Sequence, residues 1–382
     1  MTRAFSLLFV TVSLAACSSS SGATGPVDPP DELGAFAVGH STFTAKDSSR
    51  GDRSLLIDVW YPVDADDAAD AQPRQYTLSG LLGPVSDIAL ADPPVSSRRR
   101  QTLLVFSHGY GGINTQSVGL MEALASHGFI VASPEHTGNA QQSLSDSFDE
   151  AAANRVPDVS FVIDTMIARS QDANDAFHER VDGSRVGVLG HSFGGMTAIG
   201  MAAGWAGASA DPRVAAILPV SAVIVKELQS DLRTSPNAGF APEQLEMIDV
   251  PVMLMGGSED VDVFPENNEI AFEQIVNAPR VYRVDIIGAT HTHFASVCWI
   301  GDYLISIGFT QDRWAALGAE DLIEPYQVTC GPDALPIEVS NRLAQLYTVA
   351  FFKRHLLGER GYDAYLTPAF ADAEPAVELF RK

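Results

Sequence analysis

A single serine stands between glycines at the end of a short apolar run. Residues 185–195 read RVGVLGHSFGG, and residues 186–189 are typical of a buried strand. Gly190 and Gly194 would let the backbone turn sharply into a helix, with Ser192 at the apex, strained and with its hydroxyl exposed. The helix that follows would direct its N–H groups and positive dipole end at the same point. The pattern predicts a serine nucleophile; the alternative is a glycine-rich turn with an idle serine.

A serine hydroxyl is a weak nucleophile until a base takes its proton, and histidine is the usual base. His291 and His293 follow the apolar run at residues 281–287, which we predict to be the last strand. In folds with this strand–turn–helix arrangement the nucleophile comes first in the chain, the acid second and the histidine last. We therefore expect His291 to be the base and His293 to be an auxiliary or surface histidine.

The acid of such a site orients the imidazole and stabilises its positive charge. Residues 250–255 form another apolar run, and the sequence GGSEDVD follows it. We expect Asp260 to be the acid, with Asp262 as the main rival and Glu259 as a weaker one. Any of the three could instead be a solvated loop carboxylate.

An oxyanion site needs two backbone N–H groups directed at the developing charge. One should come from Phe193, directly after the serine. The other should come from the loop after the apolar run at residues 102–106, which reads SHGYGG, and the Tyr110 N–H is our choice. The alternative for this loop is a flexible glycine turn.

Apolar runs of strand length alternate with helical patterns along the chain. We predict strands at residues 54–60, 102–106, 129–132, 186–189, 214–220, 250–255 and 281–287, and helices at 117–127, 159–168, 195–203, 268–276 and 338–357. This alternation predicts an α/β fold with a mostly parallel, doubly wound sheet and flanking helices. Ligands bind such sheets at the carboxyl edge of the strands. Residues 34–382 should form one domain, with insertions at 64–100, 221–247 and 298–336.

The composition narrows the classes of partner. The chain has 382 residues, with 48 acidic against 24 basic side chains and a net charge of −24. Nucleic acid and anionic membranes both require basic patches, so neither is an expected partner of the folded domain. The acidity is typical of a soluble protein in an extracellular or salty medium.

The N-terminus resembles the leader of a bacterial lipoprotein. Arg3 precedes a short apolar run at residues 4–14, and the sequence LAAC ends at Cys17. The resemblance implies that residues 1–17 form a signal peptide ending at a lipidated Cys17; the alternative is an ordinary secretory signal. Ser18, rather than an aspartate, implies sorting to the outer membrane. Residues 18–33 should be a disordered tether, so that the lipid is the domain's only membrane contact.

Two further cysteines, Cys298 and Cys330, remain in the chain. An even pair in an exported protein predicts a disulfide.

Several longer stretches resemble α/β-hydrolases, and within them the platelet-activating-factor acetylhydrolase family. They read LLVFSHGYGG, LASHGFIVASPEH, GHSFGG and GATHTHFA. The resemblance implies a calcium-independent serine esterase, without a cofactor, acting on short or oxidised acyl chains of phospholipids. It also implies that His291, and not His293, is the catalytic histidine.

The position of the acid departs from that family. The family takes its acid from just after the strand that follows the nucleophile helix, where this chain has LPVS at residues 218–221. Asp260 lies one strand later, as in bacterial polyester hydrolases, cutinase-like esterases and dienelactone hydrolases. We therefore predict a serine carboxylic ester hydrolase that acts on a small-molecule or lipid ester, and we leave its acyl length and oligomeric state open.

Two hypotheses from other classes compete with this one. A metal site could use His291 and His293 with Asp260 and Asp262 nearby, because these residue types are metal ligands. A surface lipoprotein could also keep the fold for binding alone. A chelator test separates the metal site from the esterase. A chain that does not react with a fluorophosphonate probe would favour the binding protein.

Overall fold

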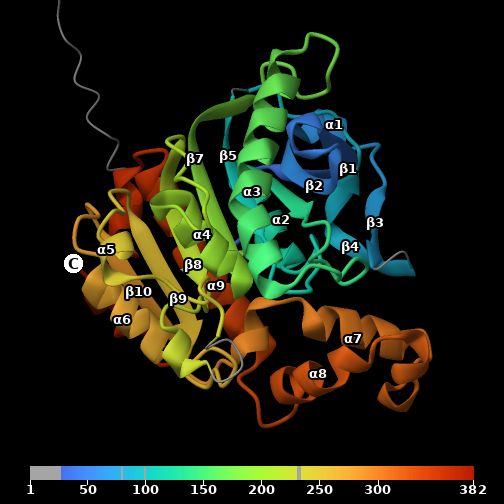
Figure 1. Cartoon of the computed structure of the whole chain (residues 1–382). Coiled ribbons are helices and arrows are strands. Elements are labelled where there is room, and N and C mark those ends of the chain that lie inside the picture. The colour runs from blue at the N-terminus through green and yellow to red at the C-terminus, as the bar shows by residue number, and fades with distance from the viewer. Residues whose placement is uncertain (1–26, 79–80, 99, 230–233) are drawn as a thin grey trace, which may run out of the picture.

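One sheet runs through the whole domain (Figure 1). The computed structural model describes residues 27–382 except 79–80, 99 and 230–233. Within these residues eleven strands follow the order β11-β10-β9-β8-β7-β5-β6-β2-β1-β4-β3. The strands are β1 (Ala37–Asp47), β2 (Arg53–Val63), β3 (Pro73–Leu78), β4 (Leu81–Ala91), β5 (Gln101–Ser107), β6 (Ile130–Glu135), β7 (Val181–His191), β8 (Val214–Val220), β9 (Val252–Gly257), β10 (Val281–Ile286) and β11 (Val377–Arg381).

The centre of the sheet is parallel, as predicted. Strands β6, β5, β7, β8, β9 and β10 pair in parallel, and their side chains are almost all buried because helices cover both faces. Antiparallel pairs flank this centre, where β2 pairs with β6 and β11 pairs with β10, and β1 pairs with β4 in parallel further out. The carboxyl ends of the parallel strands therefore gather at one edge, below the sheet in Figure 1.

Helices cover the two faces of the sheet in separate layers. The helices of the described residues are α1 (Ala65–Ala68), α2 (Val118–Ser126), α3 (Phe148–Gln171), α4 (Phe193–Ala203), α5 (Pro242–Leu245), α6 (Glu266–Gln274), α7 (Val297–Ser306), α8 (Ile323–Cys330), α9 (Ile337–His355) and α10 (Pro368–Ala371). One apolar core lies between the sheet and α3, α4 and α6, and the other between the sheet and α2 and α9. The layered α/β architecture predicted from the sequence is confirmed.

Three elements differ from the sequence prediction. The strand at residues 281–286 is not the last, because β11 adds a further strand beside it. Residues 64–100, expected as an insertion or surface connection, contain β3 and β4, which extend the opposite edge of the sheet. Helix α3 begins eleven residues before the predicted position 159. A capping box of Ser147 and Glu150 starts it, and the helix continues through Pro157.

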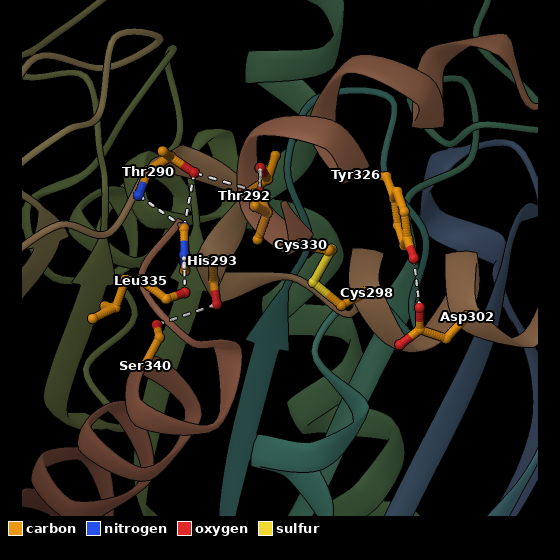
Figure 2. The surroundings of a disulfide bond; sticks show 10 residues. Thr290, Thr292, His293, Cys298, Asp302, Tyr326, Cys330, Leu335 and Ser340 are labelled. Carbon is orange, nitrogen blue, oxygen red and sulfur yellow. Dashed lines mark hydrogen bonds between the residues drawn. A yellow bond between two sulfur atoms is a disulfide. The ribbon is translucent and has the colours of Figure 1, made fainter. Parts of the chain in front are cut away.

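The insertion at residues 298–336 forms a small helical unit beside the carboxyl edge, with α7 and α8 as its main helices. The sulfur atoms of Cys298 and Cys330 lie at bonding distance and join the two helices (Figure 2). Trp314 is fully buried inside the unit, with its ring edge-on to Tyr326. In the described residues of the insertion at 221–247, the regular elements are a 3-10 turn and α5.

The structure describes the last part of the predicted tether, from residue 27. The predicted signal peptide, Cys17 and the first part of the tether lie outside the described residues. Residues 27–33 lie against the domain: the carbonyl of Glu32 accepts a hydrogen bond from Gln345 at 2.7 Å, and that of Asp28 accepts one from Tyr362 at 3.1 Å. The tether boundary predicted at residue 33 is therefore too late. Among the described residues, no helix has the length and apolar character needed to span a bilayer.

Candidate active site

Ser192 occupies a strained turn between β7 and α4. Its φ of 59° and ψ of −119° lie in a region that residues with a side chain rarely adopt. The two flanking glycines are required by close backbone contacts: a Cβ on Gly190 would lie 2.3 Å from the carbonyl oxygen of Gly194, and one on Gly194 would lie 1.8 Å from that of Ser107. The N–H of Ser192 donates to the carbonyl of Val220 at 2.8 Å, which holds the turn against β8. The structure thus has the turn that the glycine pattern predicted.

His291 and Asp260 are in direct contact, although 31 residues separate them. The Nδ1 atom of His291 lies 2.8 Å from Oδ2 of Asp260, whose side chain is 1% exposed against 12% for the histidine. The other carboxylate oxygen accepts the N–H groups of Asp262 at 3.1 Å and Val263 at 2.8 Å. Burial raises the pKa of Asp260, but the hydrogen bond and charge of His291 and the Val263 N–H outweigh it and hold that pKa below 3.8. Asp260 is therefore a carboxylate at neutral pH.

The rival residues do not make the contact that Asp260 makes, although a carboxylate oxygen of Asp262 lies within 4.8 Å of a ring nitrogen of His291. The side chains of Glu259 and Asp262 are exposed, and Asp262 gives Asp260 only its backbone N–H. His293 is buried, where its Nδ1 accepts from the N–H of Thr290 at 2.9 Å and its Nε2 lies 3.1 Å from the carbonyl of Leu335 (Figure 2). His293 therefore connects the turn after β10 to the start of α9 and does not face Asp260.

His191 is a site residue that the sequence reasoning missed. Its Nδ1 lies 2.7 Å from the amide nitrogen of Gln116, which can only donate, so its Nε2 carries the proton and donates to the carbonyl of His291 at 2.9 Å. Burial and the charge of His291 lower the pKa of His191 to about 3, so the ring stays neutral. The side-chain oxygen of Gln116 accepts the Gly109 N–H at 2.8 Å. His191 and Gln116 thus link the loop before Tyr110 to the backbone of the candidate base.

The candidate oxyanion donors come from the two loops that flank Ser192. Phe193 is the first residue of α4, so its N–H has no partner within the helix. Tyr110 lies on the loop after β5, and its ring meets that of Phe193 edge-on at 5.4 Å. This loop passes close to the serine, because a Cβ on Gly109 would lie 3.6 Å from the Cβ of Ser192.

Three potential metal ligands also come together at this site. Ligand atoms of Asp260, Asp262 and His291 lie within 4.8 Å of one another. His293, which the metal hypothesis also needed, has both ring nitrogens engaged with Thr290 and Leu335. A cation would compete with the hydrogen bond between Asp260 and His291, so the geometry favours that pair as a proton-handling unit.

A cavity of about 330 Å³ lies behind the site, on the α9 side of the sheet. His191 and Trp299 are among its lining residues, and Ser192 is not. Glu122 also faces it, and accepts hydrogen bonds from Ser86 at 2.6 Å and Tyr76 at 2.9 Å. Burial raises the pKa of Glu122 to about 6, although both hydroxyls lower it.

Comparison with known proteins identifies the fold. A ferulic acid esterase from Streptomyces cinnamoneus superposes with a TM-score of 0.64 over 90% of this chain and 96% of its own, at 23% identity. Residues 90–265 match the chlorophyllase family. The chain has the α/β-hydrolase fold. The sheet order, the strained serine between β7 and α4 and the late histidine are all features of this fold.

Two groups of sequence relatives of this chain are carboxylic ester hydrolases. Platelet-activating factor acetylhydrolase of Canis lupus familiaris is 27% identical over 143 residues, which is 32% of each chain. Cutinase 2 of Thermobifida cellulosilytica is 34% identical over 92 residues, 24% of this chain and 30% of the cutinase. The chain thus matches about a third of the length of these curated relatives. The resemblance predicted from the sequence motifs is confirmed.

Proposed function

We propose that this α/β-hydrolase is a serine carboxylic ester hydrolase with Ser192, His291 and Asp260 as its catalytic residues. The observation that carries the proposal is the buried Asp260 carboxylate on Nδ1 of His291, in the same site as a serine held at φ 59°. A positive φ on a non-glycine residue costs of order 1–3 kcal/mol and persists mainly where function requires it.

The chemistry follows from this arrangement. Because Asp260 holds the proton on Nδ1, the Nε2 of His291 is free to accept the proton of Ser192 as its oxygen attacks the ester carbonyl. The N–H groups of Phe193 and Tyr110 would stabilise the negative oxygen that forms. His291 then returns the proton to the departing alcohol, which leaves an acyl group on Ser192. A water that loses its proton to His291 releases the acid and restores the serine.

The surface around Ser192 supports an ester with an apolar part. Tyr110 on the oxyanion loop, Leu144 beside it, and Val261 and Phe264 just after Asp260 are all exposed apolar side chains. The net charge of −24 disfavours strongly anionic esters. The named relatives act as an acetylhydrolase and as cutinases, so we infer either a short-chain lipid ester or a polyester as the substrate class.

A series of p-nitrophenyl esters from acetate to palmitate tests the proposal, with protein lacking residues 1–17 and Ser192→Ala as the blank. A steep fall in kcat/KM beyond short chains supports the acetylhydrolase-like substrate. A flat or rising profile supports an open cleft suited to polyester. Rates equal to the blank for every ester would overturn the esterase proposal.

We also propose that the chain is exported as a lipoprotein anchored in the outer membrane through Cys17. The support is the sequence LAAC after an apolar run, followed by Ser18. The mature protein should carry a diacylglyceryl mass on Cys17, and Cys17→Ala should release it from the membrane fraction. An unmodified Cys17 in membrane-associated protein would contradict the anchor.

A further inference from the structure

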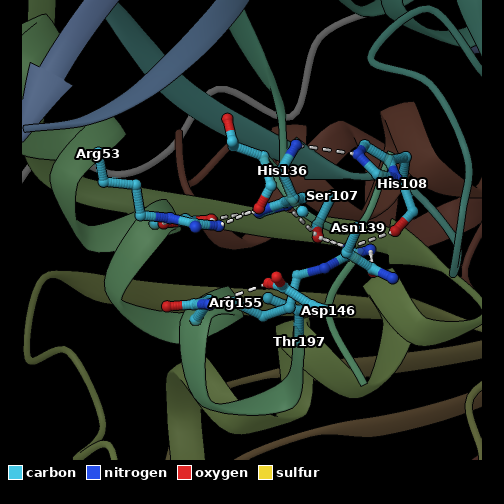
Figure 3. A network of polar contacts seen from close by, with 12 residues as sticks. Arg53, Ser107, His108, His136, Asn139, Asp146, Arg155 and Thr197 are labelled. Atoms are coloured by element: carbon cyan, nitrogen blue, oxygen red, sulfur yellow. Dashed lines mark hydrogen bonds and ion pairs between the residues drawn. The ribbon is translucent and has the colours of Figure 1, made fainter. Parts of the chain in front are cut away.

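A buried arginine holds the loop that carries one candidate oxyanion donor (Figure 3). Arg155, on α3, has no exposed surface. Its Nη1 donates to the hydroxyl of Ser107 at 3.0 Å and to the carbonyl of His108 at 2.5 Å. Its Nη2 donates to the carbonyl of Gly109 at 2.9 Å and to the side-chain oxygen of Asn139 at 2.5 Å. One guanidinium therefore donates hydrogen bonds to three consecutive residues, from the end of β5 into this loop.

The Gly109 carbonyl receives two further donors. The N–H of His136 donates to Nε2 of His108 at 3.1 Å, so the neutral His108 ring carries its proton on Nδ1. That proton is donated to the carbonyl of Gly109 at 2.7 Å, and the N–H of Gly112 reaches the same oxygen at 3.2 Å. Burial and the charge of Arg155 lower the pKa of His108 well below its ordinary value, which keeps the ring neutral.

The Gly109 carbonyl belongs to the same peptide group as the Tyr110 N–H. In a planar trans peptide these two groups point in opposite directions, so fixing the carbonyl also fixes the N–H. A cation bonded to the carbonyl also polarises the peptide and makes its N–H a stronger donor. Arg155 further lies 4.8 Å from the ring centre of Phe193, the residue that would supply the other donor.

Burying this charge is costly, and an apolar side chain could fill the same space without that cost. Asp158 lies one turn along α3 and offsets part of this charge, but the same carboxylate also pairs with Arg50 at 2.7 Å, Arg53 at 2.7 Å and His136 at 2.9 Å. Burial lowers the pKa of Arg155 to about 9, which still leaves it a cation at neutral pH. A fully buried cation bonded to the loop of a candidate oxyanion donor points to a function beyond packing.

We propose that Arg155 is a positioning residue that directs and polarises the Tyr110 N–H toward the oxyanion. The proposal rests on the proposed esterase function and deepens it. It assigns the oxyanion donor to the peptide between Gly109 and Tyr110, and it gives the α3 guanidinium a role in the rate of acylation rather than in ester binding.

The test compares an ester with its thionoester, in which sulfur replaces the carbonyl oxygen. Sulfur accepts hydrogen bonds weakly, so the ratio of the two kcat/KM values reports the strength of the oxyanion site. Loss of one oxyanion donor costs about 10²–10³ in kcat, so a misdirected donor in Arg155→Met should cost about 10–100-fold, with little change in KM. The ester-to-thionoester ratio should fall by a similar factor.

Arg169→Met is the control variant, because Arg169 lies on the same helix but donates to Asp175 at 2.8 Å instead of to the loop after β5. It should lose stability while keeping the ratio of the unaltered chain. Arg155→Lys keeps a charge but cannot reach four acceptors, and its ratio should also fall. If Arg155→Met does not fold, the lysine variant decides the question.

The outcomes separate the two proposals. If the unaltered chain hydrolyses the ester and the folded Arg155 variants keep its ester-to-thionoester ratio, whether both substrates slow equally or neither slows, the role of Arg155 alone is overturned. An unaltered chain no faster than Ser192→Ala would overturn the esterase function and this role with it.

Discussion

Replacing Asp260 by asparagine changes one atom of the site and gives the amide two possible orientations. In the first, its oxygen keeps the N–H groups of Asp262 and Val263, and its NH₂ group faces Nδ1 of His291. Nδ1 must then accept, so the imidazole proton moves to Nε2, which can no longer take the proton of Ser192. In the second, the oxygen accepts from Nδ1 as the carboxylate did, and the NH₂ group faces the two backbone N–H groups.

The second orientation is the active one, and its cost sets the magnitude. Two buried N–H groups lose their acceptor at about 1–3 kcal/mol each, together about 2–6 kcal/mol. Because each 1.36 kcal/mol corresponds to a factor of ten, the active orientation is populated about 30-fold to 10⁴-fold less than the inactive one. The missing negative charge also removes stabilisation of the imidazolium, so we expect kcat to fall about 10³–10⁴-fold, as it does when triad acids elsewhere become amides.

The assay is kcat for the best p-nitrophenyl ester, with thermal unfolding measured in parallel. Asp260→Asn should unfold near the temperature of the unaltered protein, since its side chain keeps the same shape. Asp262→Asn is the matched control: its side chain is exposed and its backbone N–H is unchanged, so kcat should stay close to that of the unaltered protein. A loss below about tenfold for Asp260→Asn, or a larger loss for Asp262→Asn, would refute the assignment of the acid.

Three further predictions concern the histidines, the cysteines and a buried acid. His291→Ala should abolish ester turnover, whereas His293→Ala should lower the melting temperature but keep much of the activity; the reverse pattern would move the base to His293. In protein lacking residues 1–17, iodoacetamide should label Cys298 and Cys330 only after reduction, and labelling without reductant would contradict the disulfide. Folding raises the pKa of Glu122 from 4.5 to about 6, so its stabilising contribution is complete below 4.5 and is lost as the pH rises through 6. Glu122→Gln should therefore raise the free energy of unfolding by up to about 2 kcal/mol near pH 7.5 and by little near pH 4; equal gains at both would refute this reasoning.

Much of the fold could be predicted because its signals are local. The apolar runs that form β5 to β10 are buried on both faces, and such strands appear in the sequence as continuous apolar stretches. The edge strands β3 and β4 gave no such signal, since they alternate exposed and buried residues and include Pro84 and Gly83. The first part of α3 was not predicted, because a proline usually ends a helix, whereas Pro157 lies inside this one.

The sequence by itself determined the turn at Ser192 and the order of serine, acid and histidine, because strand, glycines and helix are neighbours in the chain. It narrowed the acid to the loop after β9 and favoured Asp260 there, with Asp262 left as the main rival. Only the tertiary structure decided that Asp260 faces His291, since that depends on how the loop after β9 packs against the one after β10. The contacts of His191 with His291 and of Arg155 with Gly109 were likewise decided there, because they join residues 100 and 46 positions apart and have no local pattern.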